Sequence, residues 1–121
     1  MCCNANGDFL PLYVIYKSNI IRESWTQTGP AGCRYNCSES GWMESVHFIE
    51  WFEKIFIDYV KEIEGAKLLI FDGHSSHISI ELIELAKANN VHLLCLPAHT
   101  SHLLEPLDVC VYKPKLIGKN F

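Results

Sequence analysis

Two short apolar runs on either side of a helix-like segment constrain this 121-residue chain more than any other feature. The first run, residues 67–72, is Lys-Leu-Leu-Ile-Phe-Asp, and the second, residues 91–96, stops at Pro97. Continuous apolar runs of this length are typical of strands that are buried on both faces. Between them, Ser79 is a plausible N-cap for a helix over about residues 80–89. The pattern predicts two adjacent parallel strands joined by a right-handed helical crossover.

The part of the chain before these runs predicts more strand and one long helix. Asn6-Gly7 is a strong hairpin turn signal, because both residue types tolerate positive φ. Residues 9–16 are rich in aromatic and β-branched side chains and predict a strand. Residues 18–41 are polar and interrupted by Gly and Pro, which indicates an irregular connection.

From about residue 44 to residue 62, apolar side chains recur at spacings of three and four, as on the buried stripe of a helix. Ser45 is the expected N-cap, and Gly65 is a good C-terminal stop. Trp51 falls on the stripe, so it is better explained as a core residue than as a platform for nucleic-acid bases. One broad face of this helix is expected to pack on the sheet.

A further helix is expected to begin at residues 103–112. The order of elements, with strands and helices alternating in the second half, predicts an α/β domain with a mixed sheet flanked by helices.

Composition and charge restrict what such a domain does. Apolar residues make up 49% of the chain and charged residues 20%, as in ordinary globular proteins. Six cysteines without a secretory signal indicate reduced, intracellular thiols. No apolar run approaches the roughly 18–20 residues that span a membrane. With a net charge of −4, the chain lacks the concentrated basic surface of a domain that binds DNA by itself.

Two acids are candidates for a metal or substrate site. Asp72 ends a buried strand, where ligands collect in open α/β sheets, although a carboxylate there also serves to cap a turn. Asp108 follows after 35 intervening residues, beyond the next strand and a loop rich in His and Ser/Thr. The alternative for Asp108 is an exposed acid in the first turn of a helix, where the macrodipole favours it. Because the two strands are expected to be neighbours, the two carboxylates are candidates for one pocket.

The histidines raise a competing hypothesis of a zinc-binding module. The spacings His74-x-x-His77 and His99-x-x-His102, together with a Cys-x-x-x-Cys at residues 33–37, involve side chains that bind zinc. These spacings match no strong zinc signature. The other interpretation is that His74, His77 and His102 orient the acidic loops, contact phosphate, or satisfy nearby backbone groups.

Two stretches of sequence carry a resemblance to a known family. Residues 68–77 (Leu-Leu-Ile-Phe-Asp-Gly-His-Ser-Ser-His) and residues 96–109 (Leu-Pro-Ala-His-Thr-Ser-His-Leu-Leu-Glu-Pro-Leu-Asp-Val) resemble the two distal catalytic blocks of DDE superfamily endonucleases. The nearest subgroup is the pogo, Tigger and jerky-like transposases, which are relatives of the mariner superfamily. Residues 3–12 and residues 41–52 are similar to the middle region of the same family, so the resemblance covers nearly the whole chain.

The resemblance implies an RNase H-like fold with three metal-binding carboxylates. Asp72 then corresponds to the second and Asp108 to the third, and the first is expected on a strand upstream of Met1. Asp8 and Asp58 do not replace it, because one follows a hairpin turn and the other lies inside a helix. The expectation is therefore one partial domain over residues 1–121, with its first strand missing. Ala98 and Glu105 depart from the residues usual in the family.

The implied function is DNA cleavage and strand transfer with Mg²⁺ or Mn²⁺ in the intact protein. Two divalent ions about 3.5–4 Å apart stabilise the attacking and leaving oxygens of an in-line displacement, and three acids hold them. The expected partner is DNA, bound mainly through other domains, with no membrane and with dimerisation of the intact protein. The expected location is the nucleus. The alternative is a domesticated, non-catalytic DNA-associated protein.

Overall fold

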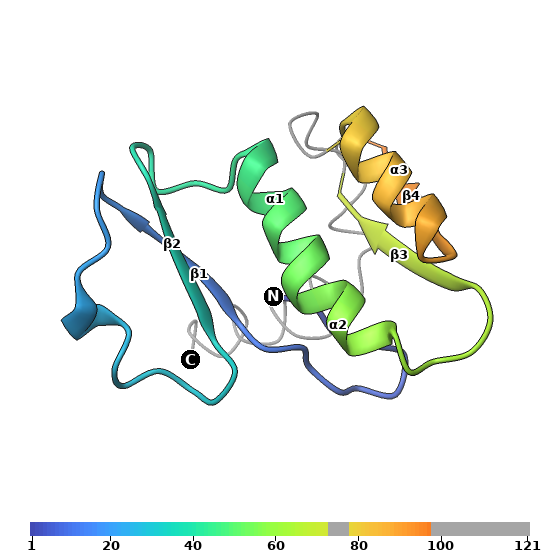
Figure 1. Cartoon of the computed structure of the whole chain (residues 1–121), viewed down its shortest axis with the longest axis horizontal. Helices are drawn as coiled ribbons and strands as arrows, with labels where there is room; N and C mark the ends of the chain where they lie inside the picture. Colours follow the sequence, from blue (N-terminus) through green and yellow to red (C-terminus); the bar gives the residue numbers. More distant parts are fainter. Residues whose placement is uncertain (73–77, 98–121) are drawn as a thin grey trace, which may run out of the picture. The chain divides into compact units, whose positions relative to one another are not determined.

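The computed structural model describes residues 1–72 and 78–97, and the chain divides into two compact units, Met1–Ile63 and Glu64–Phe121. We call them the N-terminal unit and the C-terminal unit. Each contains a two-stranded parallel sheet and helix, in the order shown in Figure 1.

The N-terminal unit opens with the expected hairpin turn. Gly7 has a φ of 90° and donates its N–H to the carbonyl of Asn4, and Cys3 forms an antiparallel bridge with Phe9. The strand that follows, β1, spans Tyr13–Lys17 and so begins later than residue 9. Pro11 explains the delay, because it has no N–H to donate to a strand partner.

The predicted irregular connection over residues 18–41 is wrong in its second half. It contains a short 3₁₀ helix, η1 (Glu23–Trp25), and then strand β2 (Arg34–Ser38). Strand β2 pairs with β1 in parallel, with Tyr13 opposite Arg34 and Lys17 opposite Ser38. Figure 1 shows the two strands side by side. The segment Arg-Tyr-Asn-Cys-Ser has neither apolar alternation nor a β-branched residue, so its strand character comes from its partner and not from propensity.

The long helix of the N-terminal unit has three consecutive parts: α1 (Ser45–Trp51), a π-helical stretch η2 (Phe52–Phe56) and α2 (Ile57–Val60). Its N-cap is Glu44 and not Ser45. In the π-helical stretch, the N–H of Ile57 reaches back to the carbonyl of Phe52, one residue further than in an α-helix. Trp51 is buried, which confirms it as a core residue. The buried side chains of the long helix are His47, Phe48, Trp51, Phe52, Ile55, Phe56 and Val60.

The C-terminal unit follows the predicted pattern closely. Strands β3 (Lys67–Phe71) and β4 (Val91–Cys95) are parallel neighbours, and α3 (Ile80–Ala88) connects them. The side chain of Ser79 accepts a hydrogen bond from the N–H of Leu82, as an N-cap should.

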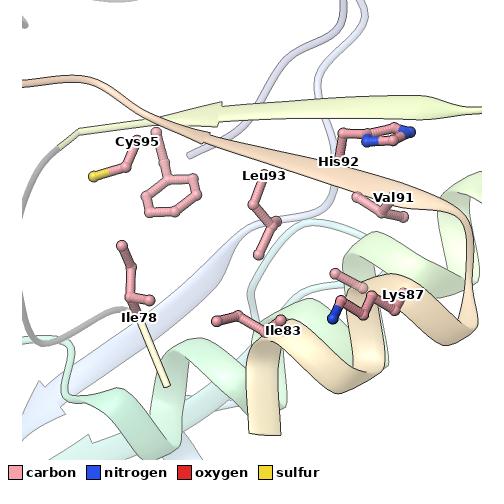
Figure 2. Close-up of a pocket in the computed structure, with 9 residues that line it drawn as sticks. Ile78, Ile83, Lys87, Val91, His92, Leu93 and Cys95 are labelled. Atoms are coloured by element: carbon pink, nitrogen blue, oxygen red, sulfur yellow. The ribbon is translucent and has the colours of Figure 1, made fainter. Parts of the chain in front are cut away.

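One detail of the C-terminal unit differs from expectation. In the described part of the C-terminal unit, one face of the strands is covered, by residues that pack with α3 (Figure 2), and the other face is not. The covered face and the helix contribute the buried side chains Leu69, Phe71, Leu82, Ala86, Val91 and Leu96. On the opposite face, Leu68 is 59% exposed, Ile70 44% and Leu94 46%. An apolar run therefore gives the position of a strand without showing how many of its faces are covered.

The observed elements confirm an α/β fold. In the described residues the strand pairs are parallel, and the antiparallel element is the bridge at the first hairpin. Two expectations concern contacts between the two units: a single mixed sheet, and packing of the long helix on strands β3 and β4. Both stay predictions. The helix expected over residues 103–112 lies outside the described residues.

Candidate functional site

Asp72 lies immediately after β3, at the carboxyl end of the parallel pair. It is half-buried. The last residue pair of the ladder joins Phe71 to Cys95, so β4 ends beside the residue that precedes Asp72. Because both strands run in one direction, the loops that follow them leave from the same edge of the sheet, which is where α/β proteins place ligands.

Two contacts, one from β4 and one from the residue after it, fix the backbone at this edge. The N–H of Leu96 donates to the carbonyl of Phe71 over 2.8 Å. The thiol of Cys95 contacts the carbonyl oxygen of Asp72 with an Sγ–O distance of 3.7 Å, the geometry of a weak S–H donor. The position of Asp72 thus depends on the neighbouring strand as well as on its own. This contact was not expected from the sequence, because it depends on the register between two strands.

The remaining predicted site residues are not described. Asp108 and the supporting candidates His74, His77 and His102 lie outside residues 1–72 and 78–97. Within those two ranges, no three His, Cys, Asp or Glu side chains gather as a metal site would require. The juxtaposition of Asp72 and Asp108 in one pocket therefore stays a prediction.

The described residues contain no cluster of side chains that would support the zinc hypothesis. Cys33 and Cys37 belong to the N-terminal unit, where both are free and half-buried beside or within β2. The four histidines of the two His-x-x-His spacings lie outside the described residues.

The structure adds a polar network that the periodicity concealed. Glu50 of α1 accepts hydrogen bonds of 2.6 Å from the Tyr13 hydroxyl and from the Asn36 side-chain amide. The same amide lies 3.0 Å from the Tyr13 oxygen. Burial, followed by the hydrogen bond to the Glu50 carboxylate, raises the pKa of Tyr13 to about 12. The network joins the helix to both strands, so it is structural and leaves Glu50 little freedom to bind a metal.

His47 forms a second polar link one helical turn earlier. Its Nδ1 accepts the backbone N–H of Glu44 over 3.1 Å, so the proton lies on Nε2, which donates to the carbonyl of Cys37 over 3.0 Å. The first bond belongs to a capping box at the start of α1. His47 is buried and holds the helix start against the end of β2.

The other two tryptophans differ sharply. Trp25 packs within its own unit, with the Tyr16 ring 4.8 Å from its centroid and the Arg22 guanidinium 5.5 Å away. Trp42 is 78% exposed. Of the three tryptophans, Trp42 has the most exposed side chain.

Sequence comparison identifies the family to which the chain belongs. A sequence model of the DDE superfamily endonuclease family matches residues 1–115, and the chain belongs to this family. The relatives include human pogo transposable element with ZNF domain, which is 26% identical over 117 residues. Human pogo transposable element with KRAB domain is 26% identical over 111 residues. The chain is therefore a member of the DDE superfamily endonuclease family, of the pogo type.

The matches cover most of this chain and little of each relative. For the pogo proteins with ZNF and KRAB domains, the aligned region is 97% and 91% of this chain but 8% and 18% of the relative. A Cochliobolus lunatus protein named MFS-type transporter clz9 is 37% identical over 114 residues, which are 92% of this chain and 12% of that protein. No solved structure matches the chain significantly. In the described residues, no helix has the length and apolar character of a membrane span.

Proposed function

We propose that this chain contributes two metal-binding carboxylates, Asp72 and Asp108, to the catalytic centre of a transposase-derived DNA endonuclease with an RNase H-like fold. The observation that carries the proposal is the position of Asp72 at the carboxyl end of β3, beside the end of β4. The chain leaves β4 at that same edge, and Asp108 follows β4 in the sequence. The family membership supplies the reaction class.

The donor chemistry of Asp72 fits a hard divalent cation. Mg²⁺ and Mn²⁺ prefer carboxylate oxygens, and Mg²⁺ keeps several of its waters. Asp72 is half-buried, and its backbone is held by β4, so its carboxylate starts from a defined position. Bound at Asp72 and Asp108, the cations would supply charge stabilisation to the attacking and leaving oxygens of a phosphodiester. The role of the protein is to hold the two acids at the edge of the sheet.

DNA affinity is assigned mainly to other parts of the intact, nuclear protein. The net charge of this chain is −4, and DNA binding depends on neutralising several phosphates with Lys and Arg. The family resemblance also implies three metal-binding acids, and the proposal places two of them, Asp72 and Asp108, in this chain. We therefore expect that the 121-residue chain, expressed alone, does not cut DNA. With two acids, one ion binds weakly and the two-ion arrangement is incomplete.

Metal binding is the direct test. Mn²⁺ titration followed by electron paramagnetic resonance should show weak binding to the parent chain. Asp72→Ala and Asp108→Ala should each weaken it on the order of tenfold, because affinity follows the number of charged ligands. Asp58→Ala is the matched control, since Asp58 is an exposed acid paired with Lys61. Equal Mn²⁺ affinity in all four proteins would contradict the site assignment.

A supercoiled-plasmid nicking assay with Mg²⁺ and Mn²⁺ tests the catalytic part separately. No nicking is expected from the parent chain. Nicking that is lost in Asp72→Ala would show that two acids are sufficient here. In an intact protein that contains this segment, nicking should depend on Asp72, and a fully active Asp72→Ala variant would overturn the proposal.

A further inference from the structure

The turn at Asn6 and Gly7 places a side-chain amide beside the backbone nitrogen of a glycine. Both residues are exposed. Within the described residues, the Asn6 side chain forms no hydrogen bond, and only its backbone N–H is bonded, to the side-chain oxygen of Asn4. A Cβ at Gly7 would meet nothing within 4 Å, so the space beside this residue is open to water. The Asn6 amide is therefore free to rotate toward the Gly7 nitrogen.

This arrangement brings together the two groups of an intramolecular reaction. The Gly7 backbone nitrogen gives up its proton and bonds to Cγ of Asn6, which closes a five-membered cyclic imide. The side-chain nitrogen of Asn6 takes up a proton and leaves as ammonia. Tethering the two groups makes the attack unimolecular, and glycine has the backbone freedom that ring closure requires.

Water then opens the imide ring in one of two ways. Cleavage of the bond from nitrogen to Cγ restores the original main chain and leaves aspartate at position 6. Cleavage of the bond from nitrogen to the backbone carbonyl carbon leaves isoaspartate, in which the main chain runs through the side chain. One water is consumed and one ammonia is released for each amide converted, and nothing is oxidised or reduced.

The other asparagines in the described part of the chain lack one of these features. The side chains of Asn4, Asn36 and Asn89 are held by hydrogen bonds. Asn19 and Asn90 are exposed, but each precedes a β-branched residue, whose side chain restricts the backbone and crowds the attacking nitrogen. In that part of the chain, the free amide and the following glycine occur together at position 6.

We propose that Asn6 is a site of spontaneous modification, which converts it through the cyclic imide to aspartate and isoaspartate, and that the isoaspartate form loosens the first hairpin. The side-chain oxygen of Asn4 accepts the N–H groups of Asn6 and Asp8, each over 2.9 Å. Isoaspartate inserts a methylene into the main chain between these two N–H groups, so one oxygen no longer meets both. The inference does not depend on metal binding or DNA cleavage.

The loosening should reach the helix, because Asn4 also links the hairpin to α2. Its side-chain nitrogen donates to the Tyr59 hydroxyl over 3.0 Å. Two backbone bonds close the hairpin beyond the turn, from the N–H of Asn4 to the carbonyl of Asp8 and from the N–H of Leu10 to the carbonyl of Cys2, each over 2.9 Å. A change in the length of the turn strains all of these bonds together.

Peptide mapping by mass spectrometry tests the site. The folded chain is incubated at neutral pH, and aspartate and isoaspartate are quantified at each asparagine over time. Asn6 should convert fastest, and Asn19, which is exposed but precedes isoleucine, is the internal control. In Asn6→Gln, ring closure would need a six-membered ring, so position 6 should stay unmodified. Conversion of Asn6 no faster than that of Asn19 overturns the proposal.

Unfolding the chain tests whether the turn controls the rate. The N–H of Gly7 donates to the carbonyl of Asn4 over 3.1 Å, and this bond must open before the nitrogen attacks. Conversion should therefore be about fivefold faster in guanidinium chloride, the factor that corresponds to the net contribution of one hydrogen bond. Equal rates in the folded and unfolded chain would show that the turn does not hold the Gly7 nitrogen.

Hydrogen exchange tests the structural consequence. The isoaspartate form is separated by chromatography, and exchange of the Leu10 amide is compared with that of the parent. Exchange should be faster in the isoaspartate form. Asn6→Asp is the matched control, because it carries the same new charge on an unchanged main chain, and its Leu10 amide should exchange as in the parent. An isoaspartate form with parent-like exchange overturns the inferred loosening of the hairpin.

Discussion

The two units build a similar local arrangement, a pair of parallel strands and a helix, and both bury apolar side chains, but they differ in the polar contacts between helix and strands. In the C-terminal unit, Leu82 and Ala86 of α3 are almost fully buried together with Leu69 and Val91 of the strands. In the N-terminal unit, much of what joins helix to strands is polar. There, Glu50 bonds to both strands and His47 bonds to the end of β2. Apolar packing is non-directional, whereas the polar links require each partner at a set distance and angle.

The difference predicts opposite responses to substitution. The apolar unit should tolerate changes of shape that keep volume and should lose stability when volume is removed. The polar links of the N-terminal unit should be sensitive to the loss of single atoms, because a deletion leaves a partly buried partner unsatisfied.

Leu82→Ala should have the largest effect. Leu82 is 0% exposed, and its removal leaves a cavity between α3 and the strands. The expected destabilisation is about 2–5 kcal/mol, and urea unfolding monitored by hydrogen exchange of α3 amides measures it. Leu82→Met is the matched control, since it keeps the volume, and should cost less than about 1.5 kcal/mol. Equal losses of stability in Leu82→Ala and Leu82→Met would show that the volume of the Leu82 side chain is not what stabilises this unit.

The same contrast explains how much of the fold was predictable from the sequence. The strands and helix of the C-terminal unit were predicted to within a residue or so, because apolar runs and an N-capping serine are local signals. Strand β2 was not predicted, because Arg34–Ser38 is polar and is held by pairing with β1. The N-cap of α1 was misplaced by one residue, since a Glu–His capping box is a rare substitute for the usual pattern.

The candidate site divides in the same way. Asp72 was predicted from its place at the end of an apolar run, and the structure puts it at the carboxyl end of a parallel pair. Its contact with Cys95 depends on the register between the two strands, which the local sequence pattern does not determine. Trp42 and Trp51 are chemically identical in the sequence, yet one is 78% exposed and the other 8%. Only the helical spacing around Trp51 distinguished them beforehand.

His47→Ala should have the next largest effect and tests the polar unit. It removes the acceptor for the Glu44 N–H and the donor to the Cys37 carbonyl, both near the start of α1. A loss of about 1–3 kcal/mol is expected from the unsatisfied groups, visible as faster hydrogen exchange in α1. His47→Gln should recover part of it, because glutamine at this position accepts the N-cap N–H in a standard capping box. If Gln is no better than Ala, the capping bond contributes nothing.

Tyr13→Phe is expected to cost about 1 kcal/mol, the net contribution of one hydrogen bond. The change should also alter the dependence of stability on pH. The pKa of Tyr13 is raised from 10.0 to about 12 in the folded chain. Below pH 10 the hydroxyl is neutral in both states and its contribution is complete. Between pH 10 and about 12 the unfolded chain loses the proton first, so stability falls as pH rises.

The measurement for Tyr13 is the difference in unfolding free energy between parent and Tyr13→Phe across that window. The difference should shrink as pH rises. Ultraviolet absorbance of the folded parent should show a tyrosine that ionises near pH 12, and this late ionisation should be missing in the variant. A difference that is constant with pH would show that the hydroxyl makes no stronger bond in the folded state than in water.

Asp58→Asn should have the smallest effect and sets the limit of the comparison. Asp58 bonds to Lys61 over 2.6 Å, and the Lys61 ammonium lowers the pKa of the Asp58 carboxyl. A lowered pKa means that any contribution is present above the unfolded value of 3.8 and is lost as pH falls. Yet the two side chains are 56% and 66% exposed, so water and salt screen the pair, and holding it in place costs side-chain entropy. A double-mutant cycle with Lys61→Gln at low and high salt should give no coupling beyond error. Coupling that survives high salt would show that the polar contacts of this unit stabilise it through their geometry and do not need burial. The contrast between the units would then extend to their surfaces.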